Sequence, residues 1–231
     1  MTTTRSGCFP PSAVGDMSSE GAGTTLPSPR MGADIKLTMP AGSIGEFFPI
    51  LLQGFGVAAR LPCTVKTLLC DQLGLGPDYV EKRITTIFLN GKPTDTIDEA
   101  SVGAGATIAL SAAMPGLVGA TMRRDGYYAA MRSGITYRES LADVADRAAT
   151  VRIKLFNLLL PELGPEFLRR GVLLDGPVAG EFFGSRGEDF RRGGVSVLLD
   201  GSPIEAVRLV DGVRFDEESV VRLTVIFRDG E

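Results

Sequence analysis

The sequence predicts an α+β protein made of two similar units in tandem, each with an opening strand, one helix and further strands. Three observations carry this prediction. Each half opens with an alternating, strand-like run, each contains a strand that leads into a tight turn, and each ends with a further strand. A chain of 231 residues is long enough for two small units that each bury a modest core.

The outer strands are predicted at residues 34–39 and 107–111 in the first half, and at 151–156 and 220–227 in the second. Both opening strands contain the triplet Ile-Lys-Leu, in which apolar and polar residues alternate as on a strand with one buried face. The order of elements is the same in both halves, which favours a duplication. A chance repeat of common strands and turns is the alternative, because the spacing of the elements differs between the halves.

A strand in the middle of each half runs straight into a turn signal. Residues 84–89 lead into Asn90-Gly91, and residues 195–199 lead into Asp200-Gly201. Such dipeptides favour type I′ turns, because both central positions of that turn require positive φ.

One helix is predicted in each half between the opening and closing strands. In the first half Thr64 is a candidate N-cap and Gly74 a candidate stop, and the apolar residues between them recur at helical spacing. In the second half Pro177 is a candidate first residue, and Phe182 and Phe183 would form the apolar face.

Composition limits the possible partners. The formal charge of −4 provides no basic field for a phosphate backbone, so we expect no nucleic-acid partner. The most apolar run, residues 47–59, is interrupted by Pro49 and Gly54 and is shorter than the roughly 20 residues that span a bilayer. We therefore expect a soluble cytoplasmic protein without a membrane partner.

The absence of histidine limits the possible chemistry. It removes the commonest general base near neutral pH and the commonest transition-metal ligand. The three cysteines, Cys8, Cys63 and Cys70, lack the spacing of a disulfide framework or a metal knuckle, and are expected to be reduced. We expect no catalytic residue, metal or cofactor and no enzymatic activity. An enzyme that acts through carboxylates or arginines, with Asp200 or Arg192 as candidates, is a further alternative.

The first half resembles the small sulfur-carrier proteins of thiamine and molybdopterin biosynthesis at residues 61–69, 72–75 and 87–93. In those proteins a Pro-x-Thr-Val entry precedes the helix, and a Leu-Asn-Gly segment joins two strands. The resemblance covers about residues 35–119. It implies the ubiquitin-like β-grasp fold, a mixed sheet of four or five strands curled around one helix.

In the second half, residues 153–156 followed by Leu163-Gly164 resemble the opening hairpin of the molybdopterin-type carriers. Two tandem β-grasp domains are therefore expected. The resulting division of the chain is a flexible tail rich in Ser, Thr, Gly and Pro at 1–32, domain 1 at 33–119, a connector with helical character at 120–150, and domain 2 at 151–231.

Carrier function in that family depends on a free C-terminal Gly-Gly, which an activating enzyme adenylates. Here the equivalent of the carrier tail contains Gly116 and Gly119 and the chain continues, while the second unit ends with the single Gly230 before Glu231. We therefore expect a non-catalytic protein-binding or assembly module with a sulfur-carrier-like fold. The alternative is a sulfur or thiocarboxylate carrier after processing near Gly119, with the adenylating enzyme as its partner.

The connector contains the candidate contact surface. Large Arg and Tyr side chains are typical of interface hot spots, and five of them are grouped here: Arg123, Arg124, Tyr127, Tyr128 and Arg132. We expect a protein partner or self-association through this surface and through open sheet edges. A second interpretation is that the tyrosines and Met131 pack against a sheet while the arginines stay solvated. A short surface helix is also predicted at 138–147.

Overall fold

The computed structural model describes residues 30–132, 134–137, 147–186, 190, 195–211 and 213–228. Most of the predicted tail, most of the predicted surface helix at 138–147, Arg192 and the C-terminal Gly230 lie outside the described residues. The last three residues of the predicted tail, 30–32, begin the first strand.

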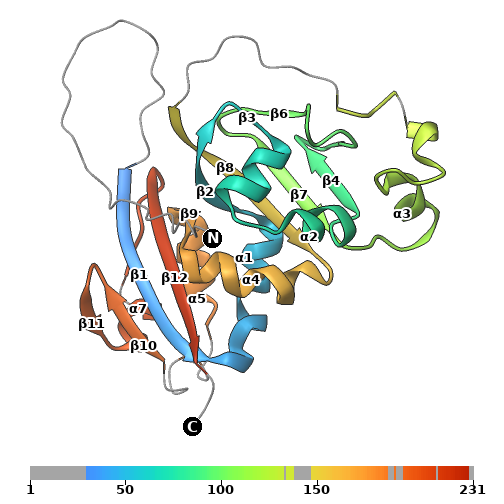
Figure 1. Cartoon of the computed structure of the whole chain (residues 1–231). Coiled ribbons are helices and arrows are strands. Elements are labelled where there is room, and N and C mark those ends of the chain that lie inside the picture. Colours follow the sequence, from blue (N-terminus) through green and yellow to red (C-terminus); the bar gives the residue numbers. More distant parts are fainter. Residues whose placement is uncertain are drawn as a thin grey trace, which may run out of the picture.

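The elements follow one another along the chain as Figure 1 shows. The first half contains β1 (Arg30–Pro40), η1 (Ala41–Phe47), α1 (Phe48–Gln53), β2 (Phe55–Leu61), β3 (Cys63–Thr64), η2 (Thr67–Gln72), α2 (Pro77–Lys82), β4 (Thr86–Leu89), β5 (Lys92–Pro93), β6 (Ser101–Val102) and β7 (Thr107–Ser111). After α3 (Gly116–Met122) and η3 (Ala129–Arg132), the second half contains β8 (Arg147–Phe156), α4 (Leu159–Arg170), β9 (Val172–Asp175), α5 (Gly176–Gly184), β10 (Ser196–Leu199), β11 (Ser202–Ile204), α7 (Ala206–Asp211) and β12 (Ser219–Arg228).

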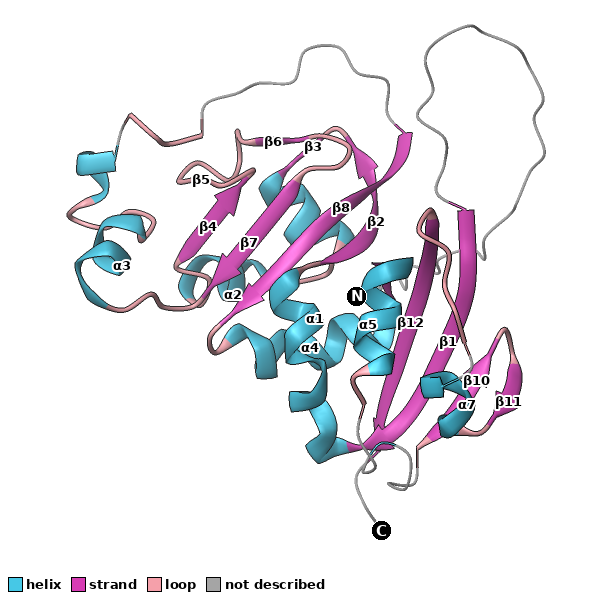
Figure 2. Ribbon diagram, turned by 180° about the vertical axis from the view of Figure 1, so that it is seen from behind, coloured by secondary structure: helices cyan, strands magenta, loops and turns pink. Residues whose placement is uncertain are grey.

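The fold is α+β, as predicted, and is organised around one mixed sheet. Ten strands are joined in the order β11-β10-β1-β12-β9-β2-β8-β7-β4-β5, and β3 and β6 form a separate two-stranded ladder. We call β2, β8, β7, β4 and β5 group A, and β9, β12, β1, β10 and β11 group B. The two groups lie side by side in Figures 1 and 2. They meet between β2 and β9, where Gly56 pairs with Leu173.

Two separate tandem β-grasp domains are not confirmed, because each group contains the opening strand of the other half. The first strand of the chain, β1, lies in group B between β12 and β10, and runs parallel to β12. The opening strand of the second half, β8, lies in group A between β2 and β7, and runs parallel to β7. The two halves have thus exchanged their opening strands and share one continuous sheet.

The shared Ile-Lys-Leu triplet explains why either strand fits either group. Ile35 and Leu37 of β1 are fully buried on the face where the core lies, as are Ile153 and Leu155 of β8. In both strands the lysine between them points to the opposite face, because successive side chains on a strand alternate. The buried side chains are the same in both strands, so the local pattern does not specify which sheet accepts which strand.

A helix follows each opening strand, and both helices end at a glycine with positive φ. Gly54 ends α1 with φ 113° and Gly171 ends α4 with φ 92°, a conformation that favours glycine. The hairpin expected at Leu163-Gly164 is not formed, because both residues lie inside α4. Six of its residues are buried, which makes the helix amphipathic despite the internal Pro165.

The local turn and cap predictions are confirmed. Asn90, Gly91, Asp200 and Gly201 all have positive φ, as type I′ turns require. The N–H of Thr67 donates to the Thr64 hydroxyl at 3.1 Å, which is the expected N-cap bond.

The stop of the first-half helix is also as predicted. Gly74 has φ 65° and follows η2, which is wound as a π-helix. In the second half α5 spans Gly176–Gly184 and buries Phe182 and Phe183.

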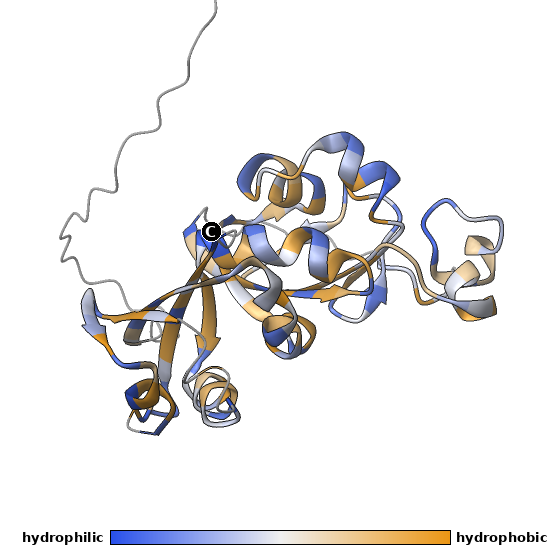
Figure 3. Cartoon of the chain, turned by 90° about the horizontal axis from the view of Figure 1, so that it is seen from below, coloured by the Kyte–Doolittle hydropathy of each residue, from blue (hydrophilic) through white to orange (hydrophobic). Residues whose placement is uncertain are grey.

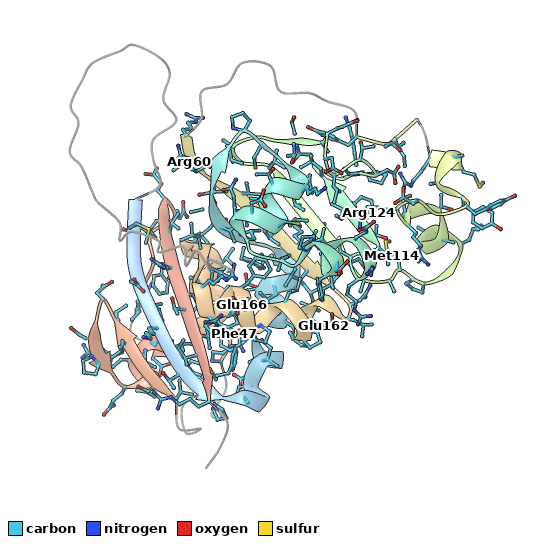
Figure 4. The ribbon with its side chains drawn as sticks, in the orientation of Figure 1. Phe47, Arg60, Met114, Arg124, Glu162 and Glu166 are labelled. Atoms are coloured by element: carbon cyan, nitrogen blue, oxygen red, sulfur yellow. The ribbon has the colours of Figure 1, made fainter. Side chains whose placement is uncertain are left out.

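A single hydrophobic cluster lies beneath both groups. Helix α4 packs against β12 of group B and β8 of group A, and the Phe55 and Phe167 rings lie 5.1 Å apart between β2 and α4. Phe47, which Figure 4 labels, packs against Phe182 with ring centroids 5.5 Å apart. Figure 3 shows the long strands largely in hydrophobic colours. The halves therefore share one core as well as one sheet.

Candidate partner-binding surface of the connector

The connector joins two neighbouring parallel strands of group A. The chain leaves β7, passes through α3 and η3, and re-enters the sheet as β8, which pairs with β7 in parallel register from Thr107↔Arg152 to Ser111↔Phe156. Both ends of the connector are therefore attached to the same group. In Figures 1 and 2 its described part, with α3, extends beyond the β4 side of group A.

Arg124 attaches the connector to α2. Its side chain is only 9% exposed, and one guanidinium nitrogen donates to the carbonyl oxygens of Val80 and Ile84 at 2.8 and 2.9 Å. Its backbone N–H donates to the Thr85 carbonyl at 2.8 Å. Burial lowers the pKa of the guanidinium, yet arginine keeps its proton at any ordinary pH. The group thus caps the carbonyl end of α2, on the side of group A that faces α3 in Figure 4.

Arg132 closes the connector on itself. The residue is 3% exposed, and its side chain forms a bidentate ion pair with Asp95, with N–O distances of 2.5 and 2.9 Å. The same guanidinium donates to the carbonyl oxygens of Thr121 and Arg123 at 2.7 and 3.2 Å. One side chain therefore joins the end of α3, the end of η3 and the loop after β5.

Tyr137 holds the connector along the edge of the sheet. Its backbone N–H donates to the carbonyl of Pro93 in β5 at 2.9 Å, and its buried ring carries a hydroxyl that donates to the Ser101 carbonyl at 3.1 Å. The connector thus occupies part of the β5 edge. The other edge strand, β11, has three residues and includes Pro203, which lacks an N–H donor.

Large apolar side chains are concentrated on the outside of this attached segment. Tyr127 is 92% exposed and Met131 is 73% exposed, and Tyr128 packs edge-on against Tyr127 with ring centroids 5.1 Å apart. We define the connector surface as the six exposed apolar residues Leu117, Val118, Tyr127, Tyr128, Met131 and Ile135. Such grouped exposure is typical of interaction sites.

A polar cleft of about 650 Å³ borders the connector surface. Tyr127, Tyr128 and Arg123 line it from the connector, and Glu81 and Lys82 line it from α2. Aromatic side chains next to charged ones provide both apolar contact area and directed hydrogen bonds. The cleft therefore places charged side chains next to the apolar surface.

The five residues proposed from the sequence divide into two sets. Arg123, Tyr127 and Tyr128 are exposed together on the cleft. Arg124 and Arg132 lie in the interior and hold the connector in place. In the second interpretation the aromatic residues pack against a sheet and the arginines stay solvated. It is correct for Arg123, which is exposed, and wrong for the two tyrosines and the other two arginines.

Sequence reasoning missed Leu117, Val118 and Ile135, and it assigned Met131 to packing. The available signal was the density of apolar residues between Gly116 and Tyr137 in a segment without strand or helix periodicity. Asp95 was also missed. Asp95 follows a turn, where solvated aspartates are common, so nothing in its local sequence pointed to an ion pair with Arg132.

The glycines of the expected carrier tail do not form an extended tail here. Gly116 and Gly119 belong to α3, and a Cβ built on Gly119 would lie 1.8 Å from the Met114 carbonyl oxygen. A carrier tail must be extended to enter an activating enzyme, so α3 would have to unwind first.

The chemistry available in the described ranges is limited. Among these residues no group of three or more Cys, Asp and Glu side chains is placed to hold a metal ion. Cys63 and Cys70 are half-buried, and burial raises the pKa of the Cys70 thiol, which disfavours the nucleophilic thiolate. Within the same part of the chain, no helix is both long and apolar enough to cross a bilayer.

Comparison of the chain with protein-family models, with curated proteins and with solved structures gave no match.

Proposed function

We propose that the chain is a non-catalytic, cytoplasmic protein-binding module whose docking site is the connector surface. The observation that carries the proposal is that one segment has six exposed apolar side chains and is held to the rest of the fold by two buried arginines, Arg124 and Arg132. A surface held in one conformation before binding loses less entropy when a partner docks. The sequence-level resemblance to ubiquitin-like β-grasp carriers agrees with such a role, because those proteins act through protein contacts.

The chemistry of the surface indicates a partner with an apolar patch flanked by acidic groups. The apolar residues would pack against the patch, while Arg123 and Lys82 at the cleft would pair with carboxylates. Tyr127 and Met131 are the residues expected to contribute most, because they have the largest exposed fractions of the six side chains.

Site-specific photo-crosslinking in the native cells tests the proposal. A benzophenone amino acid is placed at Tyr127 or, as a control, at Lys36, which is exposed on β1 in group B. The expected result is one discrete adduct from position 127 that is absent from position 36, and that weakens when Leu117→Ser and Met131→Ser are added. Equal labelling from both positions would contradict a docking site on the connector.

The mass of the adduct distinguishes the two kinds of partner. An adduct of twice the chain mass identifies a second copy, and any other mass identifies a different protein. The same mass spectrometry tests the carrier alternative, since processing would leave a species ending at Gly119 with a thiocarboxylate mass shift.

A further inference from the structure

The open face of group A carries an apolar groove that lies apart from the connector surface. It has a volume of about 690 Å³, within the roughly 300–1,000 Å³ typical of small-molecule sites. Phe88, Ala109, Ser111, Lys154 and Phe156 line it on three adjacent strands, β4, β7 and β8. These side chains point away from the core, because they alternate with the buried residues of the same strands.

The register of the strands forms the groove. Ala109 of β7 lies directly between Phe88 of β4 and Lys154 of β8, and in the next outward row Ser111 lies beside Phe156. Small side chains on the central strand thus form the floor, and large side chains on both neighbours form the walls. A floor from Thr107 to Ser111 is about 13 Å long, at roughly 3.3 Å per residue.

Both ends of the groove are fixed by hydrogen bonds. At one end the Asn90 side chain accepts from the N–H of Thr107 at 2.9 Å. At the other end the Asn157 amide donates to the Ser111 hydroxyl at 3.0 Å and also to the Ala113 carbonyl. The second pair of bonds holds the segment that leads to Met114, which forms the end wall. The groove is therefore preformed on rigid strands.

Lys154 provides the charge. It is the one charged residue among the described residues that line the groove, and its ammonium forms no hydrogen bond or ion pair with any described residue. A half-buried cation that lines the groove together with two aromatic residues, and that has no partner among the described residues, is complementary to a ligand that carries one carboxylate on an apolar body.

The geometry points to a binding site for a small amphipathic carboxylic acid, with its apolar chain along Ala109 between Phe88 and Phe156 and its carboxylate on Lys154. This inference does not depend on the proposed connector function, because the six residues of the connector surface do not line the groove.

Isothermal titration calorimetry with decanoate tests the site, with decanol as a neutral probe of the same chain length. The wild-type chain is expected to bind decanoate more tightly than decanol. Lys154→Met should weaken decanoate binding about tenfold or more, as expected for loss of a hydrogen bond to a charged group. It should leave decanol binding unchanged, and Lys154→Arg should restore decanoate binding.

Lys36→Met is the matched control, because Lys36 occupies the same Ile-Lys-Leu triplet on β1 and pairs with Leu198 in group B. It should bind decanoate as the wild type does. Ala109→Phe fills the floor of the groove with a residue that favours strands, and should abolish binding of both probes while the thermal unfolding temperature is retained.

Three results would each overturn the proposal. They are an absence of decanoate binding at millimolar concentration, equal affinities for Lys154→Met and Lys36→Met, and unchanged binding by folded Ala109→Phe. A loss of binding with Leu117→Ser would place the ligand on the connector surface and would also overturn it.

Discussion

Gly56 of β2 pairs with Leu173 of β9, and this contact joins the two five-stranded groups into one sheet. Each of the two residues stands two positions after the glycine that ends the preceding helix, Gly54 in one half and Gly171 in the other. Equivalent positions of the two halves therefore face each other across an antiparallel pair. The sheet has a local two-fold relationship at its centre, even though the order of strands in group B differs from that in group A.

The junction gives the first prediction. A Cβ at position 56 would lie 2.8 Å from Thr150 Cγ2 and 3.1 Å from Leu173 Cβ, so the Thr150 side chain must move and Leu173 must give by a few tenths of an ångström. Gly56→Ala is expected to lower the free energy of unfolding by about 1–3 kcal/mol, the usual range for overpacking. Urea denaturation measures the change. Gly42→Ala is the control, because no atom of a described residue lies within 4 Å of its Cβ position. Equal stability of both variants would contradict close packing at the junction.

The second prediction concerns the attachment of the connector. Arg132→Met leaves Asp95 and two carbonyl oxygens without their donor, and should lower the free energy of unfolding by about 2–3 kcal/mol. Hydrogen exchange should speed up across residues 116–137 more than in β1 or β12.

Arg123→Met is the matched control, since Arg123 is exposed and its backbone carbonyl is unchanged by the substitution. It should alter stability by no more than about 0.5 kcal/mol. If hydrogen exchange of the connector is the same in both variants, Arg132 does not hold it.

The third prediction is a pH dependence that comes from Glu162 of α4. Hydrogen bonds from Arg83 and Tyr79, at the end of the first-half helix α2, lower the pKa of Glu162 to about 2. Burial, and after it the hydrogen bond to Glu162, raises the pKa of the Tyr79 hydroxyl above its usual range. A carboxyl whose pKa is lower in the folded state stabilises the fold above its unfolded pKa of about 4.3. This stability is lost as the pH falls from about 5 towards 2.

Glu162→Gln should therefore remove part of the slope of stability against pH between about 5 and 2. Urea midpoints at a series of pH values measure this slope. Glu99→Gln, at an exposed carboxylate of the first half, should leave it unchanged. The contact between Glu162 and Arg83 joins the two halves.

Features that depend on a few neighbouring residues were predictable from the sequence. The turns at Asn90 and Asp200 follow from the need for positive φ, and the cap at Thr64 follows from the orphan N–H groups of a helix start. The strand patterns were also visible, because burial on one face enforces alternation. Helix α4 was missed because Pro161, Gly164 and Pro165 resemble breakers, whereas the amphipathic face between and after them is sufficient to form a helix.

Features that depend on distant partners were not predictable. A strand pattern specifies which face is buried but not which strand lies beside it, and β1 and β8 share the same triplet. The burial of Arg124 depends on carbonyl oxygens about 40 residues away. The groove at Ala109 exists only because β8, a strand of the other half, lies beside β7.

The position of β8 beside β7 underlies both the attached connector and the groove, and disulfide trapping tests it most directly. Ala109 and Lys154 are paired positions on parallel strands and point to the same face. In a background with Cys8, Cys63 and Cys70 replaced by Ala, the pair Ala109→Cys and Lys154→Cys should oxidise to an intrachain disulfide. The matched pair Ala109→Cys and Lys36→Cys should stay reduced. Oxidation of the second pair in place of the first would put β1 in group A and contradict the exchange of opening strands.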